Sequence, residues 1–92
     1  IVASSAQSTN ALCGLAGACL RGKHDFALFF TGEGVHLLQQ PAVLAMADKA
    51  SRAVVCEYSW EKYFAGQQPV IEQGSQTNLS ALVGQAQKVL SL

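Results

Sequence analysis

The apolar run Ala53-Val54-Val55-Cys56 ends at a thiol and is followed by the carboxylate of Glu57. Short apolar runs rich in valine are typical of strands that are covered on both faces of a sheet. In open α/β sheets, ligands and reactive groups gather just past the carboxyl ends of the strands. Cys56 is predicted to lie at such an end, where we expect the sulfur to be open to water and a thiolate on a fixed backbone to act as a nucleophile.

Other strand-like runs alternate with helical patterns along the chain. Ile1-Val2-Ala3 precedes a polar turn, and Phe26-Ala27-Leu28-Phe29-Phe30 is a second continuous apolar run. Apolar residues repeat at helical spacing over residues 11–20, 41–50 and 78–86, and Lys88-Val89-Leu90 is expected to return as an edge strand. This alternation predicts a single α/β domain over residues 1–92, with three α/β/α layers and a mainly parallel sheet of about five strands.

Composition limits the kind of partner. Charged residues make up 13% of the chain and apolar residues 50%, which leaves little charge to cover the surface of a monomer. We therefore expect a self-associating subunit. Six basic and six acidic residues give a net charge of zero, and Lys and Arg form no cluster, so nucleic acid is not an expected partner.

The pattern of apolar runs and cysteines indicates a compartment. No apolar run approaches the roughly 18–20 residues of a membrane-spanning helix, and no charged leader precedes a small-residue cleavage site. The cysteines at positions 13, 19 and 56 form neither a C-x-x-C motif nor an even set for disulfides, which is typical of a reducing compartment. We expect a soluble, cytoplasmic protein without membrane contact.

Small and polar residues near the predicted strand ends are candidates to line a site around Cys56. Gly32, Glu33 and Gly34 follow the second apolar run, where glycines allow a tight backbone path beside a ligand or form an ordinary turn. His36 comes shortly after them. It is a candidate base for Cys56 across adjacent strand ends, although a polar loop residue is the more common role for such a histidine.

Three further candidates lie elsewhere. Glu57 would oppose a thiolate if it pointed at the sulfur, and Trp60 belongs to an aromatic group that either walls a pocket or closes the core. Ser5 belongs to the polar turn of residues 5–10, which at a helix start offers backbone N–H groups to a phosphate or flavin.

Metal and cofactor chemistry are not indicated. Zinc sites need several Cys or His ligands at short spacing. Here those residues are scattered, at Cys13, Cys19, His24, His36 and Cys56. We expect neither a metal nor a cofactor.

The order of motifs is aromatic strand, Glu-Gly-Val, helix, apolar strand and cysteine. It runs from Phe29-Phe30-Thr31-Gly32-Glu33-Gly34-Val35 to Val54-Val55-Cys56 and on to Gly74 and Lys88-Val89-Leu90. In this order the chain resembles the DsrE/DsrF/TusD-like family of sulfur-carrier proteins over nearly its whole length. The resemblance implies that Cys56 carries sulfur as a persulfide, that copies assemble into dimers to hexamers, and that sulfur donor and acceptor proteins are the partners. Glu57 and Trp60 stand where the family often has small or basic residues.

The sequence thus predicts a cofactor-free, sulfurtransferase-like sulfur relay that accepts sulfane sulfur on Cys56 and passes it to an acceptor thiol. Two alternatives remain open. In the first alternative, the chain is a non-catalytic subunit of an oligomer, and its cysteine is incidental. In the second, it is a module of flavodoxin-like architecture that binds a small anionic ligand or flavin at residues 5–10.

Overall fold

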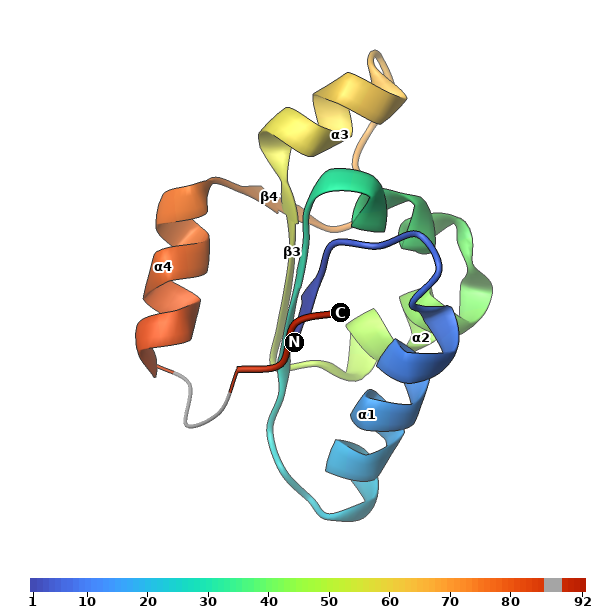
Figure 1. Ribbon diagram of the computed structural model, residues 1–92, viewed down its shortest axis with the longest axis vertical. Helices are drawn as coiled ribbons and strands as arrows, with labels where there is room; N and C mark the ends of the chain where they lie inside the picture. The colour runs from blue at the N-terminus through green and yellow to red at the C-terminus, as the bar shows by residue number, and fades with distance from the viewer. Residues whose placement is uncertain (86–88) are drawn as a thin grey trace.

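The computed structural model describes residues 1–85 and 89–92 and, within them, all side chains except those of residues 76, 78 and 85. Short strands alternate with helices along this chain (Figure 1). In order, the elements are β1 (Val2–Ala3), α1 (Thr9–Arg21), β2 (Ala27–Phe30), the 3-10 helix η1 (Gly32–Gln39), α2 (Pro41–Lys49), β3 (Arg52–Cys56), α3 (Glu57–Phe64), β4 (Glu72–Gly74) and α4 (Gln76–Gln85). The predicted α/β class is confirmed.

The four strands form one sheet in the order β1-β2-β3-β4, and every neighbouring pair is parallel. The sequence predicts about five strands, one more than the described residues form. The chain does return beside β1 at its C-terminus, where Val2 forms a single parallel bridge with Ser91. One bridge is too short to count as a strand, and Lys88 of the predicted edge strand lies outside the described residues.

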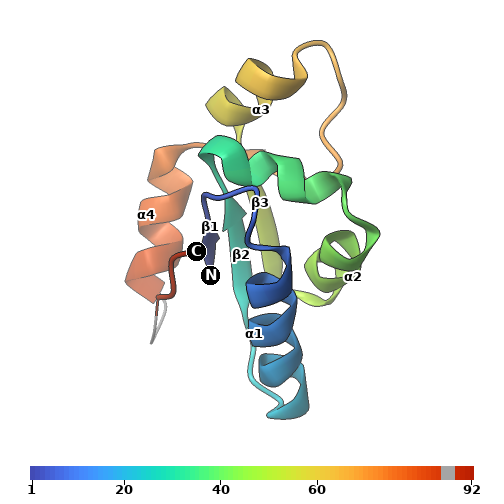
Figure 2. The same ribbon diagram turned by 45° about the vertical axis from the view of Figure 1, so that its right-hand side comes forward.

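The order of the strands determines which face each helix covers. Each step from β1 to β4 moves one place in the same direction across the sheet, and right-handed crossovers then put the connecting helices on one face. The return from β4 to the edge beside β1 crosses the sheet the other way, so α4 lies on the opposite face. Figures 1 and 2 show this arrangement, with α1 and α2 on one side of the sheet and α4 on the other.

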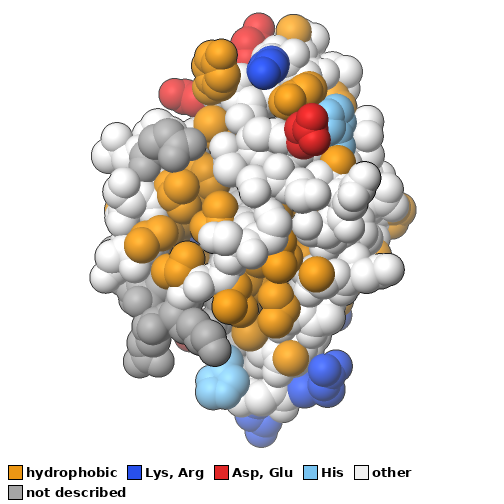
Figure 3. All heavy atoms as spheres, viewed as in Figure 1, with side chains coloured by type: hydrophobic (Ala, Val, Ile, Leu, Met, Phe, Trp, Pro, Cys, Tyr) orange, Lys and Arg blue, Asp and Glu red, His pale blue; other side chains and the backbone are white. Residues whose placement is uncertain are grey.

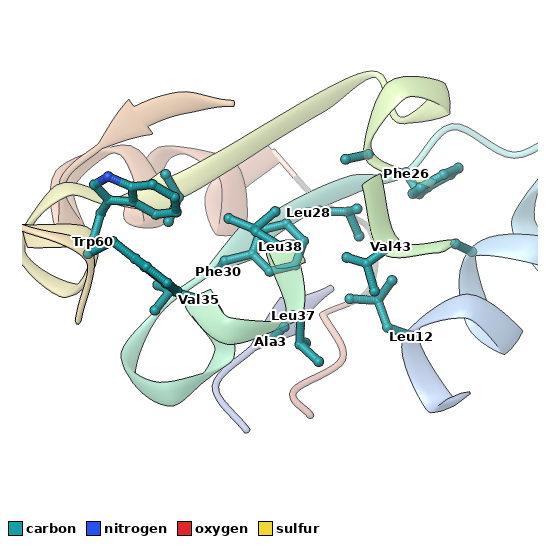
Figure 4. Close-up of a cluster of buried hydrophobic side chains, with 14 residues drawn as sticks. Ala3, Leu12, Phe26, Leu28, Phe30, Val35, Leu37, Leu38, Val43 and Trp60 are labelled. Atoms are coloured by element: carbon teal, nitrogen blue, oxygen red, sulfur yellow. The ribbon is translucent and has the colours of Figure 1, made fainter. Parts of the chain in front are cut away.

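The larger core lies on the face that carries α1 and α2. Leu28 and Phe30 of β2 pack there against Leu12 of α1 and Val43 of α2, and all four side chains are at most 1% exposed. Figure 4 shows this cluster extending from Phe26 at one end to Trp60 at the other. Burying an aliphatic or aromatic side chain of this size stabilises the fold by about 1.5–3 kcal/mol, so this cluster is the main source of stability.

A smaller cluster lies on the α4 face. Because side chains alternate along a strand, Val54 and Cys56 point away from the larger core and pack with Phe29. Leu79 and Leu82 of α4 cover this trio. Cys56 therefore belongs to the thinner layer of the molecule, where, within the described residues, α4 covers the sheet.

The structure differs from the sequence-based expectation after β2. The stretch from Gly32 was expected to be a turn beside a site, and it forms the eight-residue 3-10 helix η1, with Val35, Leu37 and Leu38 buried in the larger core. The helix predicted from Pro41 is confirmed as α2, with the proline in its first turn. Within the described residues, no helix has both the length and the hydropathy needed to span a bilayer.

Candidate functional site: the thiol at the carboxyl end of β3

Cys56 is the last residue of β3 and the N-cap of α3. Its strand neighbour in the register is Gly74, the last residue of β4, and α4 begins two residues further on at Gln76. Two helices therefore start at the edge where the sulfur lies. Helix N-termini carry a partial positive charge and unpaired N–H groups, and both favour an anion such as a thiolate.

The Cys56 side chain is 4% exposed in the single chain. We expected a thiol open to water, and this expectation is wrong for the chain by itself. The physical reason is the alternation of side chains along β3, which turns Cys56 towards the α4 face, where Leu79 and Leu82 lie over it. A reagent therefore reaches the sulfur only if the start of α4 moves or if it enters along the carboxyl edge of the sheet.

The other side of the sulfur is polar. Donor groups of three residues lower the pKa of Cys56: the hydroxyl of Thr31, the backbone N–H of Tyr58, and both the backbone N–H and the hydroxyl of Ser59. Ser59 is itself 5% exposed, and its Oγ accepts a hydrogen bond of 2.9 Å from the backbone N–H of Gly32. The hydroxyl thus accepts from one backbone group, and it also helps to lower the pKa of Cys56.

These donors set the acidity of the thiol. Burial is the largest single influence and raises the pKa of Cys56, because it disfavours the charged thiolate. The hydrogen bonds from Ser59, Tyr58 and Thr31 act in the opposite direction, since they stabilise the negative sulfur. Together they outweigh burial, and the pKa of Cys56 is lowered from its ordinary value. Thiolate is the nucleophilic form of cysteine, so the site favours reactivity over inertness.

Of the glycine and glutamate candidates, Gly32 contacts the thiol site, Gly34 packs against β1, and the two glutamates lie at the surface. Gly32 contacts the site through its N–H bond to Ser59. Gly34 is buried against the backbone of Ala3, one strand further from the thiol, so its role is in packing. The side chains of Glu33 and Glu57 are exposed, at the starts of η1 and α3 respectively.

His36 and Trp60 lie on the side of the larger core rather than beside the sulfur. The ring of His36 contacts the rings of Tyr63 at 4.8 Å and Phe64 at 5.3 Å, both edge-on. Trp60 is 5% exposed, packs on Phe64 at 4.6 Å between ring centroids, and donates from Nε1 to the carbonyl oxygen of Gln67. The geometry therefore assigns both side chains to an aromatic cluster that closes the end of the core.

Ser5 lies just past β1, which β2 separates from β3. Neighbouring strands are about 4.8 Å apart, so the ends of β1 and β3 are roughly 10 Å apart. The Oγ of Ser5 accepts a hydrogen bond from the backbone N–H of Gln7 at 3.2 Å. The polar turn of residues 5–10 is thus a separate feature from the thiol site.

Sequence reasoning missed Thr31 and Ser59, the two hydroxyls beside the sulfur. A signal was present for Ser59, because it stands three residues after Cys56. This is the spacing at which an N-cap side chain meets the third residue of a helix. Thr31 carries no such signal, because its proximity depends on β2 and β3 being neighbours in the sheet.

In the part of the chain that the structure describes, no three His, Cys, Asp or Glu side chains gather closely enough to hold a metal ion. Comparison of the chain with protein-family models, with curated proteins and with solved structures finds no match.

Proposed function

We propose that this protein is a sulfur relay of the cytoplasm, in which Cys56 accepts sulfane sulfur from a donor and passes it to an acceptor thiol. One observation carries the proposal. Donor groups of Thr31, Tyr58 and Ser59 lower the pKa of Cys56 although its side chain is buried. A cysteine that served only as core filler would have no use for these donors, and burial alone would raise its pKa.

The chemistry needs no cofactor and no external oxidant. The Cys56 thiolate attacks the outer sulfur of a donor persulfide, a sulfur–sulfur bond forms at Cys56, and the bond between the two donor sulfurs breaks. The donor leaves as a thiolate, and Cys56 holds the outer sulfur as a persulfide. In the second half, an acceptor thiolate attacks that outer sulfur and Cys56 leaves as a thiolate, for which the same hydrogen-bond donors make it a good leaving group.

The buried position of the sulfur has a use in this reaction. Persulfides react readily with thiols, and a covered site protects the carried sulfur from small thiols in the surrounding solution. Transfer then requires the start of α4, with Leu79 and Leu82, to move aside when a protein partner engages the carboxyl edge. These two side chains are only half-buried, in contrast to Phe29 and Val54 beneath them, which are at most 1% exposed.

Incubation with glutathione persulfide tests the proposal. We expect intact-mass spectrometry to show one added sulfur atom, and peptide mapping to place it on Cys56. The Cys56→Ser variant should lose this sulfur, while the matched control Cys13→Ser should keep it, because Cys13 lies in α1 on the other face of the sheet. Sulfur found only on Cys13 or Cys19, or a folded protein that takes up none, would contradict the proposal and leave an architectural role for Cys56.

We also propose that copies of the chain associate. Among the described side chains, five large apolar ones are exposed: Leu20, Tyr58, Val70, Val83 and Val89. Figure 3 shows hydrophobic side chains across the middle of one face, with most charged side chains at its two ends. Light scattering after size-exclusion chromatography should give a mass that is a multiple of 9.7 kDa. A monomer at high protein concentration would contradict this expectation.

A further inference from the structure

A carried sulfur needs space beside Cys56. In a persulfide the outer sulfur lies about 2.05 Å from Sγ, and the Cys56 side chain is only 4% exposed. Protein interiors are close-packed and hold few voids as large as a water molecule. The neighbours of Cys56 therefore decide where an added sulfur atom can lie.

Apolar side chains occupy the α4 face around the sulfur. Val54 lies two residues earlier on the same face of β3 and is 0% exposed, and Phe29 on β2 is 1% exposed. Leu79 and Leu82 of α4 pack over these residues. Each of these positions carries a branched or aromatic side chain, so none of them leaves room for another atom.

The direction of β4 is different. In the register of the sheet, Cys56 of β3 is paired with Gly74 of β4. Paired residues on neighbouring parallel strands project to the same face, and the strands are about 4.8 Å apart. A side chain at position 74 would therefore lie beside that of Cys56, and glycine supplies none although the residue is buried. A methyl group and a sulfur atom are close in size, so the absent side chain corresponds to one added sulfur.

The backbone does not call for glycine at this position. Gly74 is the last residue of a strand, and the glycines with positive φ in the described residues are Gly32 and Gly66. Glycine weakens a strand, and it often marks a place where a ligand approaches the backbone closely. The neighbouring thiol accounts for Gly74 better than its own conformation does.

We propose that Gly74 is a positioning residue of the sulfur relay, because its missing side chain leaves the space in which the outer sulfur of a Cys56 persulfide lies. This inference rests on the proposed function and deepens it. Both residues end their strands, so the outer sulfur is presented towards β4 at the carboxyl edge of the sheet, where an acceptor thiolate attacks it.

Substitution of Gly74 by alanine tests the space. In a parent chain that carries Cys13→Ser and Cys19→Ser, we expect Gly74→Ala to slow the uptake of sulfur from glutathione persulfide by about tenfold or more, because the methyl group overpacks the place of the outer sulfur. Intact-mass spectrometry follows the added sulfur atom. The ultraviolet absorbance of the thiolate should titrate with the midpoint of the parent chain, because alanine removes none of the donor groups that lower the pKa of Cys56.

Gly84→Ala in the same parent chain is the matched control. Gly84 lies in α4, and a Cβ there would meet nothing within 4 Å, so this variant should take up sulfur at the rate of the parent. Equal uptake in Gly74→Ala and the parent would overturn the role of Gly74 and leave the relay unaffected, whereas a folded parent that takes up no sulfur would overturn the relay itself. A shifted thiolate midpoint in Gly74→Ala would also overturn the inference, because the residue would then act through the acidity of Cys56.

Urea unfolding of the parent chain with and without the carried sulfur gives a second test, which does not require the Gly74→Ala variant to fold. A space that is already present in the native fold predicts equal midpoints, whereas an atom forced into a filled core lowers the midpoint. A lower midpoint for the sulfur-loaded chain would show that the native fold has no such space and would overturn the inference.

Discussion

Gly34→Ala is expected to lower the free energy of unfolding by about 1–3 kcal/mol or more, as overpacking against a rigid neighbour does. A Cβ on Gly34 would overlap the carbonyl oxygen of Ala3 and lie 2.6 Å from its carbonyl carbon. That oxygen already accepts a 3.0 Å hydrogen bond from the backbone N–H of Thr31, so the strand end cannot shift without loss. Urea unfolding followed by circular dichroism measures the change.

Gly14→Ala is the matched control. Gly14 lies inside α1, and a Cβ there would meet nothing within 4 Å. Alanine is favoured over glycine in a helix interior by about 1 kcal/mol, so this variant should be more stable than the unmodified chain. Opposite signs for the two substitutions would establish Gly34 as a packing residue. An unaffected Gly34→Ala protein would show that η1 does not lie against the end of β1.

Ser59→Ala is expected to raise the pKa of Cys56 and to slow its alkylation at neutral pH by about tenfold or more. Hydrogen bonds to charged groups contribute about 1.5–3 kcal/mol, and 1.36 kcal/mol corresponds to one pKa unit. In the unmodified chain the alkylation rate should rise with pH to a midpoint below that of an ordinary thiol, because the folded pKa is lowered. The variant should move this midpoint to higher pH.

The rate is best followed with iodoacetamide in a chain that carries Cys13→Ser and Cys19→Ser, so that Cys56 is the one remaining thiol. Ser59→Thr should restore the low midpoint, because it keeps the hydroxyl between Gly32 and the sulfur. Ser51→Ala removes a hydroxyl that donates to Phe26, away from the thiol, and should leave the midpoint unchanged. If Ser59→Ala alters stability but not the midpoint, the hydroxyl supports the fold and does not activate Cys56.

Much of the fold could be predicted from local patterns. The apolar runs around Leu28 and Val54 predicted the buried parallel strands β2 and β3. The helical stripe that includes Leu12 and Ala16 predicted α1, and these two residues are the buried ones of that helix. These signals depend on neighbours within a few residues. The 3-10 helix η1 was not predicted, because its two glycines suggested a turn and its stability comes from packing of Val35 and Leu37 in the larger core.

The position of Cys56 at a strand end was likewise expected, and its position at the end of β3 is confirmed. Its burial was not expected. Whether the last side chain of a strand meets water depends on which face the alternation selects and on whether a helix crosses that face. The second condition depends on the sheet order β1-β2-β3-β4 and on the path of the chain through α4.

By itself, the sequence determined the alternation of strands and helices, the sheet that follows from it, and the placement of one thiol at the end of an apolar strand. Only the packed structure shows that Thr31 and Ser59 lie near the sulfur and that Leu79 and Leu82 of α4 cover it. The physical reason is the range of the interactions. Periodicity and propensity act between residues close in the chain, whereas the acidity of Cys56 depends on donors that strand pairing brings together, such as Thr31 on β2 and the start of α3 after β3.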